Sequence, residues 1–131
     1  MKSLCLIPEG THNRGTLGYG KVYEVSYIKR LDEFNDFAGS IDSRIIFLSY
    51  NKGIVYSDDD VSPYKGKNHY KIMRSDNNCK VLSLSLLKFC ELYGVNKVYF
   101  LIDKLGPFDK FIKSIKGCGI DVELPYLYNR G

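Results

Sequence analysis

The chain has 131 residues, of which 44% are hydrophobic and 26% are charged, and its formal net charge is +4. This length fits one domain, spanning residues 1–131, with its own core, and the apolar share argues against a disordered chain. The charge permits a nucleic-acid or nucleotide partner but lacks the clustered excess of a protein that coats DNA. No stretch approaches the roughly 20 apolar residues of a membrane span, and residues 1–8 do not form a signal peptide, so we expect a soluble cytoplasmic protein.

Two strands are predicted in the first 50 residues, separated by a glycine-rich loop and a helix. The continuous apolar run at residues 3–8 predicts a buried strand, and the four glycines at residues 9–20 predict a loop. Apolar residues at three- and four-residue steps predict a helix over 21–38, which ends near Gly39. A second apolar run at 44–49 predicts the next buried strand.

The second half of the chain predicts two further helices and two further strands. The sequence predicts an irregular polar segment at 51–79, a helix at 82–93 and a strand at 97–102. A further helix is predicted to begin at Gly106 and Pro107 and to end at Gly117 and Gly119. The last predicted element is a strand at 120–124. Ser83 or Ser85 would cap the helix at 82–93, and Gly94 would stop it. The alternation of residues 120–124 predicts an edge strand with one buried face.

This order predicts an α/β fold, a small Rossmann-like three-layer domain whose mostly parallel sheet has four or slightly more strands. Right-handed crossovers would bring the carboxyl ends of the first three strands to one edge of the sheet. Polar segments follow those strands at residues 9–20, at 49–64 and from Asp103 to Gly106. Because open α/β sheets bind ligands at this edge, we expect the three segments to line one pocket.

Two carboxylates are the predicted catalytic residues. Asp103 directly follows the third predicted strand, and Glu9 directly follows the first. If both face one pocket, their mutual repulsion raises the pKa of one of them and supplies an acid and a base. Each is equally suited to cap a helix or to pair with a cation.

The predicted ligand-binding residues surround the same strand ends. They are Thr11, His12, Asn13, Arg14, Tyr23, Ser49, Asn51, Lys52 and Tyr64. Glycines beside residues 11–14 would let backbone amides approach a phosphate closely, although a flexible surface loop explains them equally well because neither GxGxxG nor a P-loop is present. Arg14 and Lys52 would bind phosphate, Tyr64 or Tyr23 would stack on a base, and Asn51 would read its edge.

Neither a metal nor a cofactor is expected. The four cysteines form no CxxC pair, and reduced buried thiols explain them without zinc. The consecutive carboxylates Asp58, Asp59 and Asp60 cannot all face one ion. Basic and aromatic residues alternate from Tyr64 to Arg74, which suits either a nucleic-acid strand or a solvated charged loop.

The segment FLSYNKGIVYSDDDVSPY resembles an uncharacterised family of bacterial and phage proteins that carries the pattern I-L-S-A-K-Y-G-L followed by P-D and P-Y. That family is distantly similar to the YaaA peroxide-stress proteins. The segments LIPEGTHN and IDVELP fit the same family more loosely. The resemblance implies a compact Rossmann-like domain with a nucleotide- or nucleic-acid-related role. The small size and the composition rich in Lys, Asn, Tyr and Ile suit a phage protein, and we expect it in a bacterial or infected-host cytoplasm. Lys52, Glu9 and Thr11 depart from the family's aromatic, cysteine and lysine residues, which puts any shared chemistry in doubt.

Three functions compete on this evidence. In the leading hypothesis the protein holds a nucleotide or a DNA base, and in its enzymatic form it acts as an N-glycosidase or a glycosyltransferase-like enzyme. Asp103 or Glu9 would then stabilise the oxocarbenium-like transition state of the N-glycosidic bond. In the second, a non-catalytic phage-type binder sequesters a nucleotide signal or blocks a host defence factor. In the third, the exposed tyrosines anchor a protein-interaction module.

Overall fold

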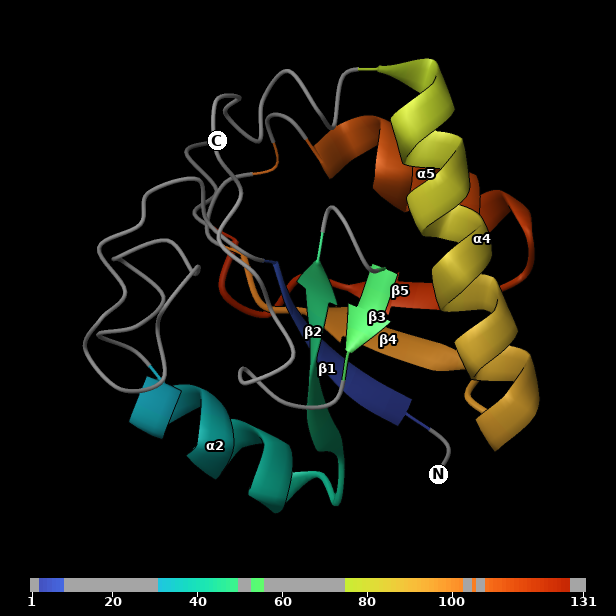
Figure 1. The fold of residues 1–131 in the computed structure, drawn as a ribbon. Helices are drawn as coiled ribbons and strands as arrows, with labels where there is room; N and C mark the ends of the chain where they lie inside the picture. Colours follow the sequence, from blue (N-terminus) through green and yellow to red (C-terminus); the bar gives the residue numbers. More distant parts are fainter. Residues whose placement is uncertain are drawn as a thin grey trace.

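The computed structural model of the chain describes residues 3–8, 31–49, 53–55, 75–102, 105 and 108–127. They form an α/β domain in which helices cover both faces of one five-stranded sheet (Figure 1). The strands are β1 (Ser3–Pro8), β2 (Arg44–Ser49), β3 (Gly53–Val55), β4 (Lys97–Phe100) and β5 (Asp121–Glu123). The helices are α2 (Leu31–Ser40), α4 (Asp76–Tyr93) and α5 (Asp109–Gly117). The predicted Rossmann-like α/β fold is confirmed.

The sheet has the strand order β3-β2-β1-β4-β5. Parallel pairing joins β2 to β1, β1 to β4 and β4 to β5, whereas β3 pairs antiparallel with β2 at the edge. The chain therefore moves outward from β1 to β2 and then crosses back to β4 on the other side of β1. This reversal makes the sheet doubly wound and places its topological switch point between β1 and β4.

The two faces of the sheet are covered by different helices. In the parallel register Leu6 lies opposite Ile46 and Phe100, so these side chains share one face, which α4 and α5 cover. Successive residues of a strand point to opposite faces, and the ring of Tyr99 accordingly packs on the other side against Phe37 of α2, at 5.5 Å between centroids. Right-handed crossovers explain why α2 lies apart from the other two helices.

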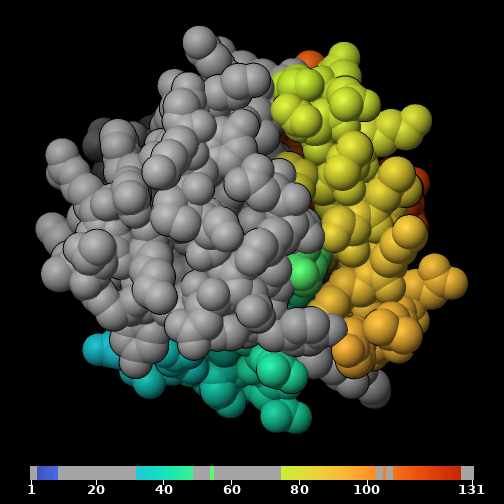
Figure 2. All heavy atoms as spheres, in the orientation of Figure 1, coloured from blue at the N-terminus to red at the C-terminus, as the bar shows by residue number. Residues whose placement is uncertain are grey.

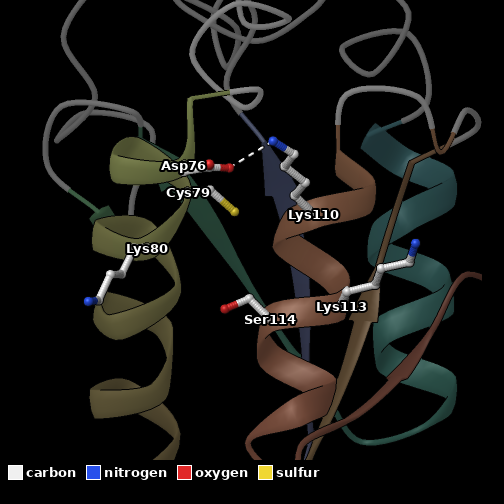
Figure 3. A pocket seen from close by; sticks show the side chains of 6 residues that line it. All are labelled: Asp76, Cys79, Lys80, Lys110, Lys113 and Ser114. Carbon is white, nitrogen blue, oxygen red and sulfur yellow. Dashed lines mark hydrogen bonds and ion pairs between the residues drawn. The ribbon is translucent and has the colours of Figure 1, made fainter.

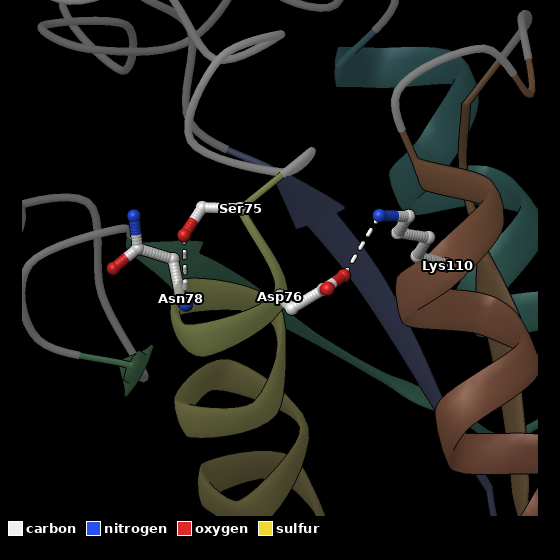
Figure 4. Close-up of polar contacts among 4 residues, drawn as sticks. All are labelled: Ser75, Asp76, Asn78 and Lys110. Atoms are coloured by element: carbon white, nitrogen blue, oxygen red, sulfur yellow. Dashed lines mark hydrogen bonds and ion pairs between the residues drawn. The ribbon is translucent and has the colours of Figure 1, made fainter.

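Helix α4 begins six residues before its predicted start. Ser75 is the N-cap, and its Oγ accepts a hydrogen bond from the backbone N–H of Asn78 at 3.4 Å (Figure 4). The predicted caps Ser83 and Ser85 lie inside the helix instead, so that prediction was wrong. Gly94 ends the helix as expected, with a φ of 68° that a residue without a Cβ adopts at no steric cost.

The other predicted boundaries agree in part with the structure. The helix predicted over 21–38 is present as α2, which ends at Ser40, and residues 21–30 of that prediction lie outside the described residues. The strands at 3–8 and 44–49 agree with the sequence, whereas β3 occupies part of the segment expected to be irregular. Strand β4 ends at Phe100, although the N–H of Leu101 still donates to the carbonyl of Leu6 at 3.0 Å. Helix α5 begins at Asp109. No helix among the described segments is long and apolar enough to cross a membrane.

Candidate functional site

The candidate site is the edge of the sheet where its parallel strands end. β1 ends at Pro8, which lies beside Leu48 of β2, and the chain continues past the end of β4 through two buried residues, Leu101 and Ile102. The switch point between β1 and β4 lies at this carboxyl edge. The helix that comes next after β1 among the described residues, α2, and the helix that follows β4, α5, lie on opposite faces of the sheet. This is the arrangement in which α/β sheets bind ligands at the carboxyl edge.

Most of the predicted site lies outside the described residues. This holds for Glu9, Thr11, His12, Asn13, Arg14, Tyr23, Asn51, Lys52, Tyr64 and Asp103. The backbone of Ser49 is described, and it is the last residue of β2, opposite Gly53 of β3. In sequence Glu9 follows the end of β1, and Asp103 follows the segment that extends β4. The two predicted catalytic residues are therefore attached to the two strands that flank the switch point.

Two helices begin at the same edge. α4 ends just before the start of β4, and α5 ends just before the start of β5, so each helix runs against the parallel strand that follows it and both point their N-termini toward the carboxyl edge (Figure 1). The two helices lie side by side. The first backbone N–H groups of a helix lack intrahelical partners and carry the positive end of its dipole, so this edge favours negative charge.

An ion pair joins the starts of the two helices. Lys110 Nζ in the first turn of α5 donates to Oδ1 of Asp76, the first residue of α4, at 2.7 Å (Figure 4). The hydrogen bond from Lys110, together with its charge, lowers the pKa of Asp76. Both side chains are largely exposed, at 56% for Lys110 and 90% for Asp76, so a ligand at this edge can reach them.

A groove of about 660 Å³ runs between α4 and α5 below that ion pair. Cys79 and Ser114 point into it from opposite sides, whereas Lys80 and Lys113 extend away from it (Figure 3). Lys113 pairs with Asp109 one turn earlier on α5, at 2.9 Å. The polar groups that face the interior of the groove are therefore one thiol and one hydroxyl.

The groove carries no catalytic constellation. Cys79 is only 5% exposed, and burial raises the pKa of its thiol, so the nucleophilic thiolate is scarce at neutral pH. Within the described segments, no three His, Cys, Asp or Glu side chains gather closely enough to hold a metal ion. What this part of the edge offers a ligand is charge, from Lys110 and from the helix N-termini.

Sequence reasoning missed Asp76 and Lys110 because it placed the first in a loop and gave the second no role. A local signal for the helix start was present, since Ser75 followed by Asp76 matches the preference for serine at the N-cap and acid in the first turn. Nothing local indicates that Lys110 lies beside Asp76, because 34 residues separate them and only the packing of α4 on α5 brings them together.

Comparison of the chain with protein-family models, with curated proteins and with solved structures found no match. The resemblance to the YaaA-like family thus stays a prediction from the sequence. The case for a function accordingly depends on the topology of the sheet and on the charges at its carboxyl edge.

Proposed function

We propose that the protein binds a nucleotide, or a nucleotide within a nucleic acid, at the carboxyl edge where β1 and β4 diverge. The single observation that carries this proposal is the strand order, which puts a switch point between those two strands. In doubly wound sheets this crevice is the general ligand site, whatever the ligand.

The charges at this edge favour a phosphate-bearing ligand. The N-termini of α4 and α5 point toward it, and Lys110 stands in the first turn of α5. An arriving phosphate would compete with Asp76 for the Lys110 ammonium and would gain from both helix dipoles. A largely exposed ion pair is weak enough to exchange in this way.

The sequence supplies the remaining groups of the proposed site. Arg14 and Lys52 would bind the phosphate, and Tyr64 or Tyr23 would stack on the base. In the enzymatic form of the proposal the protein cleaves or exchanges the N-glycosidic bond. Asp103 or Glu9 would then stabilise the positive charge that develops on the sugar as the bond to the base breaks.

Binding is tested by titrating ¹⁵N-labelled protein with nucleoside mono-, di- and triphosphates and with a short single-stranded DNA. We expect the amide signals of Ile7 and Ile102, near the carboxyl ends of their strands, to shift, and the amide of Lys97 at the start of β4 to stay. Lys110→Ala should weaken the binding of a phosphorylated ligand by about 3- to 10-fold, as expected for one charge-assisted contact.

The matched control is Lys116→Ala, which removes an exposed lysine from the last turn of the same helix, at the opposite edge. If both variants lose the same amount of affinity, the effect of Lys110→Ala comes from the change in net charge and not from a contact with the ligand. The absence of binding by every ligand of the panel would refute the proposal.

The enzymatic form has a separate test. The wild-type protein and Asp103→Asn are incubated with the ligands that bind, and release of free base is followed by chromatography. Loss of base release in Asp103→Asn with binding retained supports catalysis through this carboxylate. If the wild-type protein binds a ligand and returns it unaltered, the protein is a binder that sequesters its ligand.

A further inference from the structure

The outer side of α4 exposes an unusual share of apolar surface. Within the described part of the chain the large exposed hydrophobic side chains all belong to this helix, namely Val81 at 57%, Leu84 at 49%, Leu92 at 75% and Tyr93 at 40%. Figure 2 shows α4, in yellow to light orange, along the rim of the molecule with its outer atoms uncovered. Single exposed apolar residues are ordinary, whereas a gathering on one helix marks an interaction surface.

Three of these residues form a continuous stripe. Val81, Leu84 and Leu92 recur with Lys88 at steps of three and four residues, which places the four side chains on one face of α4. We call this face the α4 stripe. Lys88 fits such a stripe because its alkyl stem packs on apolar neighbours while its ammonium reaches water.

A hollow of about 330 Å³ lies on the α4 stripe. The described residues that line it are Val81, Leu84, Ser85 and Lys88, which stand at positions i, i+3, i+4 and i+7 of the helix. Four residues with this spacing form the hole that receives a side chain from a second helix in knobs-into-holes packing. The hollow therefore has the shape that a helical partner requires.

The charges beside the α4 stripe make it complementary to itself. Lys80 precedes the first apolar residue of the stripe, and Glu91 precedes the last one. Counted from Leu86, Lys80 and Val81 stand six and five residues before it, and Glu91 and Leu92 stand five and six after it. An antiparallel copy of the helix, turned about Leu86, sets Lys80 level with Leu92 and Val81 level with Glu91. The facing Glu91 is then displaced from Lys80, and the facing Leu92 from Val81, by only one residue, about 1.5 Å along the axis.

We propose that the α4 stripe binds the same stripe of a second copy of this chain, with the two helices antiparallel about a two-fold axis level with Leu86. Lys80 of each copy then lies within one residue of the level of Glu91 of the other, and Val81 lies within one residue of the level of Leu92. Leu84 lies level with Lys88 of the facing helix, whose alkyl stem packs on it. Each contact occurs twice, as an isologous interface requires.

This dimer is independent of the nucleotide-binding proposal. The N-termini of the two α4 helices point in opposite directions, so the carboxyl edges of the two sheets face away from one another. The proposed ligand sites stay open in the dimer, and the dimer can form whether or not a nucleotide binds.

Sedimentation velocity over about 5 to 500 μM protein tests the dimer. We expect wild type to shift from monomer to dimer over this range, and Leu92→Glu to stay monomeric because the charge would be buried at the interface. Leu92 is 75% exposed in the monomer, so the variant should keep the wild-type circular dichroism spectrum and melting temperature. A wild-type protein that stays monomeric throughout overturns the proposal.

Charge reversal tests the antiparallel geometry. Lys80→Glu and Glu91→Lys should each raise the dimer dissociation constant about tenfold, because each sets like charges opposite one another twice. A mixture of the two variants should associate as tightly as wild type, since both cross-pairs are then of opposite sign. Lys116→Glu, an exposed reversal on α5, is the control and should leave dimerisation unchanged. If the mixture associates no better than either variant alone, the proposed pairing is wrong.

Discussion

The two faces of the central sheet differ in how far water reaches them, and strand β4 contributes side chains to both. On β4, Val98 and Phe100 face α4 and α5, and each is 0% exposed. The ring of Phe100 packs against Phe108 at 5.2 Å and Phe111 at 5.7 Å between centroids. Two adjacent helices exclude water from this face, so it accepts only apolar side chains.

The opposite face of the same strand is covered differently. Tyr99 contacts Phe37 of α2, but Lys97 pairs at the edge of the sheet with Asp121 at 3.7 Å and Glu123 at 3.1 Å. The three charged side chains keep 30%, 65% and 51% of their surface exposed. Where a helix does not cover a sheet, charged neighbours on adjacent strands can stay solvated and pair. We therefore expect the same kind of substitution to lower the free energy of unfolding more on the face that α4 and α5 cover than on the opposite face.

The largest difference is expected between Phe100→Ala and Tyr99→Ala, which remove neighbouring aromatic rings from opposite faces. Phe100→Ala should lower the free energy of unfolding by about 3–5 kcal/mol, because it leaves a cavity that two helices enclose. Tyr99→Ala should cost about 1–2 kcal/mol, since its ring is only partly buried. Urea denaturation measures both, and Phe100→Leu gives a milder version should the alanine variant not fold. Equal losses would contradict the assignment of faces.

The next largest expected effect is a loss of stability at alkaline pH, which the buried cysteine thiols cause. Burial raises the pKa of Cys90 from 9.0 to about 11, and it also raises the pKa of Cys5 and Cys79. In the folded protein these thiols keep their protons at a pH where the unfolded chain loses them. Stability is therefore complete below pH 9 and falls as the pH rises from 9 toward 11, by roughly 2–3 kcal/mol from Cys90 alone.

Urea denaturation between pH 7 and 11 checks this dependence. Cys90→Ala should be less stable at pH 7, because it leaves a small cavity, but its stability should fall less steeply above pH 9. An unchanged slope would show that other groups cause the alkaline loss. The exposed Cys118 should react first with a thiol reagent, ahead of the three buried cysteines.

The smallest loss of stability is expected at the charged edge of the face that α2 covers. Lys97→Met removes the partner of Asp121 and Glu123 while keeping an apolar stem of similar length. We expect a loss of stability smaller than that of Tyr99→Ala, because exposed ion pairs contribute little, and we expect that loss to vanish in about 1 M salt. Melting temperatures at low and high salt measure it. A large loss that persists in salt would mean that Lys97 acts through packing.

Periodicity determined the elements whose burial pattern is local. The runs at 3–8 and 44–49 predicted β1 and β2 with their observed bounds, because a strand buried on both faces is apolar at every position. The alternation of residues 120–124 likewise predicted β5 as an edge strand, and β5 is last in the sheet. The early start of α4 was missed because residues 76–81 are mostly polar, and a polar first turn resembles a loop when the Ser75 cap is not recognised.

The sequence alone determined the class of fold, the alternation of strands and helices and the polar character of the segments after the strands. Those properties depend on residues near one another in the chain. Tertiary structure alone decided that β1 lies between β2 and β4, that Asp76 meets Lys110 and that the outer side of α4 is left uncovered. Such relations join residues distant in sequence, and they follow from how helices and sheet share the burial of apolar surface, which no local pattern records.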